Sequence, residues 1–92
     1  MELPPELKER YLVRRNKDLI DCNTALIEKT PTILERIGHQ LKGNAATYGY
    51  PELGLIGAAM ETSAKNNNWD ELALLTGKFE QFLLALPKHP AK

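Results

Sequence analysis

Residues 33–48 read ILERIGHQLKGNAATY, and this stretch decides the fold of the chain. Read as a helix at about 100° per residue, it carries one apolar stripe, which consists of Leu34, Ile37, Leu41, Ala45 and Tyr48. His39 projects almost opposite that stripe. The stretch therefore predicts an amphipathic helix that packs through one face and presents an imidazole to solvent on the other.

The remainder of the chain divides into further amphipathic segments of the same kind. A proline opens the first, second and third segments, in the one turn of a helix where a missing N–H is tolerated. We expect helices at residues 5–29, 31–48, 51–65 and 69–86. Thr30 is expected to cap the second helix and Asn68 the fourth, where Glu71 would complete a capping box. No segment shows two-residue alternation, so no strand is expected.

Four amphipathic helices with short connections predict an all-α fold, an antiparallel up-down four-helix bundle that forms one domain over residues 1–92. The first helix is expected to bury a line of side chains that contains Tyr11, Leu12, Leu19, Cys22 and Leu26. A second, narrower line of Val13, Ile20 and Ile27 would contact another neighbour or form a dimer seam. A monomer is the expected state.

Composition excludes several functional classes. The 92 residues include 12 basic and 12 acidic side chains, so net charge gives no general attraction to nucleic acid or to an anionic membrane. Apolar runs are far shorter than the roughly 20 residues that span a bilayer, and residues 1–5 lack the pattern of a signal peptide. The single cysteine fits a reducing cytoplasm, where we expect the protein, and no metal site is expected. Arg14 and Arg15 are expected to be solvated.

His39 shares its exposed face with Lys42 and Gly43, which follow three and four residues later. A glycine inside a helix costs about 1 kcal/mol relative to alanine, and here the missing side chain leaves room for another molecule beside the imidazole. Lys42 is placed to pair with phosphate oxygens on the ring. Glu35, four residues before the histidine, is expected to accept a hydrogen bond from one ring nitrogen. The full candidate site is His39, Lys42, Gly43, Glu35, Gln40 and Ala46.

The chain resembles the histidine phosphotransfer (HPt) domain of bacterial multistep phosphorelays in the motif His39-Gln40-Leu41-Lys42-Gly43 and in Gly49, Leu53 and Met60-Glu61. The family pattern is His-x-x-Lys-Gly, then a glycine ten residues after the histidine, a leucine fourteen after it and an apolar-Glu pair near the end of the next helix. Gly57 stands where the family usually has Cys or Ala, and it is expected to loosen the third helix.

The resemblance implies that His39 accepts a phosphoryl group from the aspartyl phosphate of a response-regulator receiver domain and passes it to another receiver. Lys42 would contact the phosphoryl group, and Gly43 would clear the docking surface. The protein would be a phosphocarrier and not an enzyme, with no nucleotide-binding or kinase region and no cofactor of its own. The receiver would supply the magnesium, and a hybrid sensor kinase is a further expected partner.

Two other interpretations stay open from the residues alone. A lone histidine on a helix is most often an ordinary surface residue. The chain could also be a non-phosphorylated helical adaptor or inhibitor that docks receiver or kinase domains, although such an adaptor does not need a nucleophile. Neither nucleic acid nor a membrane is an expected partner.

Overall fold

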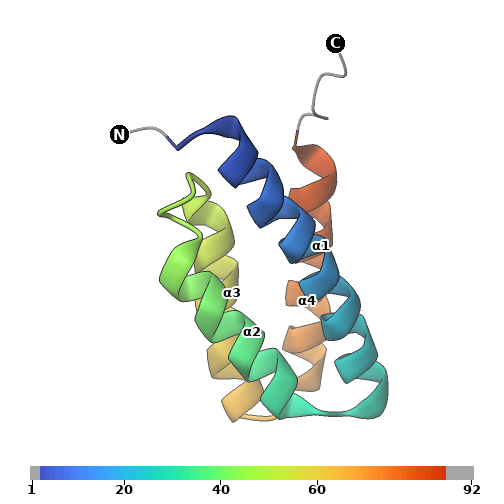
Figure 1. The fold of residues 1–92 in the computed structure, drawn as a ribbon. Helices are drawn as coiled ribbons and strands as arrows, with labels where there is room; N and C mark the ends of the chain where they lie inside the picture. Colours follow the sequence, from blue (N-terminus) through green and yellow to red (C-terminus); the bar gives the residue numbers. More distant parts are fainter. Residues whose placement is uncertain (1–2, 87–92) are drawn as a thin grey trace.

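Four helices make up the computed structural model, which describes residues 3–86. They are α1 (Pro5–Glu28), α2 (Pro31–Asn44), α3 (Pro51–Lys65) and α4 (Trp69–Ala85). Successive helices run in opposite directions, each packs against the next, and α4 returns alongside α1 to close the bundle (Figure 1). Within the described range there is no strand. The predicted all-α up-down four-helix bundle is confirmed, while residues 1–2 and 87–92 of the predicted domain lie outside the described residues.

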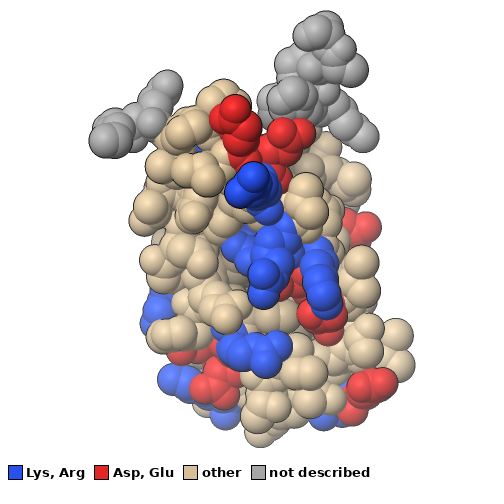
Figure 2. Space-filling view, in the orientation of Figure 1, with Lys and Arg blue, Asp and Glu red and all other residues tan. Residues whose placement is uncertain are grey.

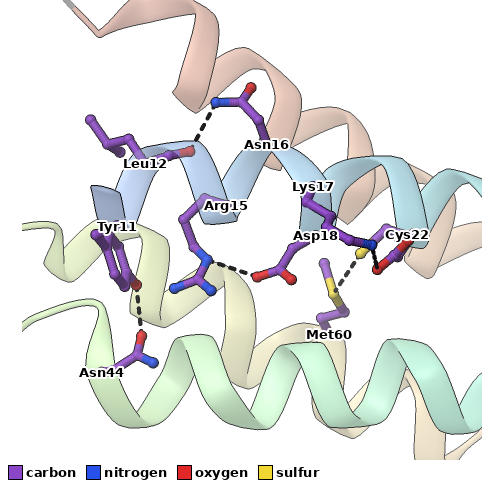
Figure 3. A network of polar contacts seen from close by, with 10 residues as sticks. Tyr11, Leu12, Arg15, Asn16, Lys17, Asp18, Cys22, Asn44 and Met60 are labelled. Carbon is purple, nitrogen blue, oxygen red and sulfur yellow. Dashed lines mark hydrogen bonds and ion pairs between the residues drawn. The ribbon is translucent and has the colours of Figure 1, made fainter. Parts of the chain in front are cut away.

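The second helix ends four residues before the predicted Tyr48. Beyond Asn44 the chain turns, with the Tyr48 N–H donating to the Ala45 carbonyl at 3.1 Å and Gly49 adopting a φ of +93°. The reason is an aromatic stack, because the centroid of the Tyr48 ring lies 4.2 Å from that of Tyr11 on α1. Tyr11 also donates a hydrogen bond to Oδ1 of Asn44 at 2.6 Å (Figure 3). These contacts fasten the end of α2 to α1.

The two predicted caps differ in outcome. The side chain of Asn68 accepts a hydrogen bond from the Glu71 N–H at 3.2 Å, which confirms the N-cap of α4. The second half of the predicted capping box is not formed, because the Asn68 N–H donates to the Ser63 carbonyl at 2.9 Å. Thr30 occupies the N-cap position of α2, as predicted, but its side chain does not form the capping hydrogen bond expected of it. The turn before α2 is closed by the backbone instead, since the Thr30 N–H donates to the Ala25 carbonyl at 2.9 Å.

The core lies between the four helices and is almost wholly apolar. Its fully buried side chains include Cys22, Leu34, Ile37, Leu41, Leu53, Met60, Leu72 and Phe79. Every helix contributes to this set, so no helix can be removed without exposing apolar surface that the others now cover.

One charged pair is buried in the bundle, and it corrects the expectation that Arg15 is solvated. Arg15 is 6% exposed, and its Nε lies 2.7 Å from Oδ2 of Asp18 (Figure 3). Its guanidinium also lies over the Tyr11 ring, 4.4 Å from the centroid. A charge taken out of water needs a partner, and the spacing of three residues along α1 supplies one. Arg14, by contrast, is exposed as expected.

Two glycines bring α2 and α3 closer together than side chains would allow. A Cβ at Gly38 would lie 2.6 Å from the Gly57 carbonyl oxygen and 2.7 Å from the Glu61 amide nitrogen. A Cβ at Gly57 would lie 2.5 Å from Cβ of Leu41 and 2.7 Å from the Gly38 carbonyl oxygen. The expectation that Gly57 loosens α3 is therefore wrong, because this residue lets α3 meet α2 at the backbone.

A methyl group at the crossing should destabilise the fold, whereas one on the open surface of α2 should not. We expect Gly57→Ala to lower the free energy of unfolding by about 1–3 kcal/mol, because backbone atoms must move to admit the Cβ. Gly43→Ala is the matched control: its Cβ would meet nothing within 4 Å, and alanine should leave stability unchanged or raise it by up to about 1 kcal/mol. Urea unfolding followed by far-UV circular dichroism measures both, and equal stability of the two variants would contradict this account of the crossing.

Candidate functional site

His39 lies on the exposed side of α2, and its ring is held by a residue of α3. The side chain is 67% exposed, as its position opposite the apolar stripe predicts. Ring nitrogen Nδ1 lies 3.0 Å from Oε2 of Glu61. His39 directly follows Gly38, and Glu61 comes one helical turn after Gly57. The close crossing of α2 and α3 therefore places the two side chains within hydrogen-bond distance.

The Glu61 carboxylate holds together a cluster of charged side chains. Its other oxygen, Oε1, lies 2.8 Å from Nζ of Lys42, and Nζ of Lys65 lies 3.8 Å from Oε2. Glu61 itself is 9% exposed, whereas both lysines are exposed. One buried carboxylate thus fixes an imidazole and an ammonium group side by side at the surface.

The environment of Glu61 determines which tautomer His39 adopts. The hydrogen bond from Lys42 is the main cause that lowers the pKa of the Glu61 carboxyl; burial opposes it, and the hydrogen bond from His39 lowers the pKa further. The carboxyl is therefore ionised at neutral pH and can only accept. Nδ1 of the imidazole must donate in this contact, so in the neutral ring Nε2 carries the free lone pair.

The other predicted site residues occupy different places around the imidazole. Gly43 is exposed one turn along α2, and a Cβ there would meet open space. Glu35 is half-buried beside His39 in a shallow hollow, but the expected hydrogen bond to the ring is made by a carboxylate of α3 instead. Gln40 is exposed and borders a second hollow between α1 and α2. Ala46 lies in the turn after α2, off the helical face on which it is predicted.

Glu61 is the functional residue that reasoning from one helix does not reveal. It lies 22 residues from His39 in the sequence and on a different helix, so the spacing rules that pair residues within a helix do not reach it. Two signals were nevertheless present. Gly38 directly precedes His39 and Gly57 comes one turn before Glu61, and these glycines allow the two helices to meet. The family pattern also singles out the pair Met60-Glu61.

The part of the chain that the structure describes contains neither a metal-binding cluster nor a membrane-spanning helix. Among residues 3–86, no group of three or more His, Cys, Asp or Glu side chains is arranged to hold a metal ion. None of the helices in that range combines the length and the apolar character that crossing a membrane requires.

The bundle and its exposed imidazole agree with a comparison against protein families. The family model described as "Hpt domain" matches residues 6–87, nearly the whole chain. The chain belongs to the Hpt domain family. No curated protein and no solved structure matched the chain in the corresponding comparisons.

Membership gives this Hpt domain a general role. Hpt domains carry phosphoryl groups in phosphorelays and are not kinases, and they interact with receiver domains and kinases. The predicted resemblance is thereby confirmed at the level of the family.

Replacement of Glu61 by glutamine should remove a pH-dependent contribution to the free energy of unfolding. The carboxyl pKa is lowered in the folded protein, so the contribution is complete above the ordinary value of about 4.3 and is lost as the pH falls through the lowered value. The stability difference between wild type and Glu61→Gln should shrink as the pH falls below about 5.

Urea unfolding across the acidic range measures this difference. Glu52→Gln, which removes an exposed carboxylate from the start of the same helix, controls for the loss of one negative charge. A stability difference that stays the same at every acidic pH would show that Lys42 and His39 do not act on Glu61 as described.

Proposed function

We propose that His39 is the phosphoacceptor of this Hpt domain. It would take a phosphoryl group from the aspartyl phosphate of one receiver domain and pass it to another. The observation that carries the proposal is the contact between Nδ1 and the buried Glu61 carboxylate at 3.0 Å. That contact occupies one ring nitrogen and leaves Nε2, on a side chain that is mostly exposed, free to attack.

The transfer balances without an added base. The Nε2 lone pair attacks phosphorus, a P–N bond forms, and the P–O bond to the receiver's aspartate breaks, so aspartate leaves as a carboxylate. The ring keeps its proton on Nδ1 and becomes positively charged, and the carboxylate of Glu61 stabilises that charge. Attack by the aspartate of the next receiver breaks the P–N bond and returns the neutral ring, with no proton lost or gained.

Lys42 would bind the phosphoryl group, and Gly43 would make room for the receiver domain that delivers it. The ammonium of Lys42 is held 2.8 Å from Glu61, beside the ring, and its exposed side chain can reach phosphoryl oxygens. Gly43 is not required by packing within the chain, since a Cβ there would contact nothing. Because Gly43 has no side chain, nothing at this position would obstruct a receiver that approaches His39. Glu35, Gln40 and Ala46 would border the docking surface.

The remaining requirements would be met by the partners. Phosphoryl transfer from an aspartyl phosphate needs its charge neutralised and its atoms aligned. We place the magnesium ion that does this on the receiver, together with the aspartate, and no cofactor on this chain. A hybrid sensor kinase would supply phosphoryl groups to that receiver, with the exchange taking place in the cytoplasm.

The site assignment predicts that a phosphorylated receiver labels this protein at His39 alone. The label should be acid-labile, as expected for a phosphorus–nitrogen bond, and His39→Gln should abolish it. His89→Gln, which removes the chain's other histidine, is the control and should label like wild type. Labelling that survives His39→Gln would refute the assignment, and binding without labelling across several receivers would favour a non-phosphorylated adaptor.

The clearance role of Gly43 predicts that a large side chain there weakens docking and leaves the fold intact. Gly43→Leu should slow transfer from the receiver by about tenfold or more, equivalent to about 1.4 kcal/mol of docking energy, with unchanged circular dichroism. Gly77→Leu, at an equally open glycine on α4, is the matched control and should transfer at the wild-type rate. Unchanged transfer by Gly43→Leu would remove this explanation of the glycine.

A further inference from the structure

The outward face of α1 carries an apolar stripe that no part of the described chain covers. Val13, Ile20 and Ile27 are 67%, 65% and 82% exposed. They are seven residues apart, and the residues on the other side of the helix, such as Cys22 and Ala25, are buried in the core. The stripe thus points away from the bundle and runs about 21 Å along the helix axis.

The stripe belongs to a seven-residue repeat in the sequence of α1. Leu12-Val13 is followed by Asn16, and Leu19-Ile20 by Asn23, with Leu26-Ile27 opening a third unit. The side-chain amide of Asn16 donates to the Leu12 carbonyl at 2.9 Å (Figure 3). The side-chain amide of Asn23 donates to the Leu19 carbonyl at 3.1 Å. A β-branched residue at every seventh position keeps one side of a long helix toward a partner helix, although Asn16 and Asn23 fill the second position of each heptad, which coiled coils usually give to apolar residues.

The charges beside the stripe favour a specific partner helix. From Arg10 onward they lie on one flank, basic residues first and acidic residues after them: Arg10, Arg14 and Lys17, then Asp21 and Glu28. In the first two turns of α1, Glu9 stands in line with the stripe and Glu6 beside it. The other flank carries the half-buried leucines and the two asparagines. Lys and Arg side chains form a band on the face that α1 and α2 present (Figure 2).

We propose that a second copy of this chain packs on the stripe, with the two α1 helices antiparallel and related by a two-fold axis through Ile20. In this arrangement Val13 contacts the partner's Ile27, and Ile20 contacts the partner's Ile20. The charged flank of one helix faces the charged flank of the other, which runs in the opposite direction. At 1.5 Å per residue, Arg10 and Arg14 lie about 15 and 9 Å from the axis, on either side of the partner's Glu28 at about 12 Å. A parallel pair would instead set the charged flank of each helix against the uncharged flank of the other.

The resulting dimer is reversible and separate from phosphotransfer. A seam along one helix is smaller than the roughly 800 Å² per partner of a standard interface, so dimerisation should depend on concentration. None of the contacts that hold His39 involves α1. The dimer would replace the expected monomer, and its interface would be the line of Val13, Ile20 and Ile27 that the sequence offers as a dimer seam.

Disulfide trapping tests the arrangement in the full chain. With oxidised glutathione as the oxidant, Ile20→Cys should form a covalent dimer, two thiols giving one disulfide while glutathione is reduced. Val13→Cys alone should stay monomeric, and an equal mixture of Val13→Cys and Ile27→Cys should cross-link. The native Cys22 does not compete, because it is fully buried and burial raises its pKa to about 12. Equal cross-linking of Val13→Cys with itself would overturn the antiparallel dimer.

Sedimentation equilibrium tests association without a cross-link. The wild-type mass should rise with concentration, and Ile20→Asp should weaken dimerisation by about tenfold or more. Leu84→Asp is the matched control, since Leu84 is 68% exposed on α4 and lies outside the stripe; it should behave like wild type. A wild type that stays monomeric at every concentration, or an equal effect of both substitutions, would overturn the proposal.

Discussion

The backbone contact between α2 and α3 is the constraint on which the rest of this structure depends. At Gly38 and Gly57 there is no room for even one methyl group on either helix. This closeness brings Glu61 of α3 up to the surface residues of α2, where its two oxygens reach both His39 and Lys42. The same contact therefore determines the packing of the bundle and the chemistry of its exposed face.

A single carboxylate serving two cationic partners gives the site its electrostatic character. Glu61 fixes the proton on Nδ1 of His39, and it holds Lys42 close to the ring. A phosphoryl group on Nε2 would compete with the carboxylate for the lysine, while the positively charged ring would bind the carboxylate more strongly.

Features that depend on neighbours along one helix could be predicted from the sequence. The exposure of His39 follows from its angle to the apolar stripe, and the cap at Asn68 follows from its spacing to Glu71. Features that depend on another helix could not. Tyr48 leaves α2 because a ring on α1 stacks against it, and Arg15 is buried because the bundle covers it together with Asp18.

The hydrogen-bond partner of His39 is also a feature that depends on another helix. Glu35 and Glu61 are both carboxylates, and only the distance between helices decides between them. That distance depends on two glycines whose effect appears once α2 and α3 are placed together. Spacing along a helix therefore predicted where the imidazole would point, but not what would orient it.

Within residues 3–86, the contacts that orient the imidazole come from α2 and α3, so the outer surfaces of α1 and α4 take no part in orienting it. Selection can therefore alter those surfaces residue by residue while the imidazole keeps its orientation. In a cell with several similar signalling routes, such a division would allow recognition to diverge after gene duplication without rebuilding the chemistry.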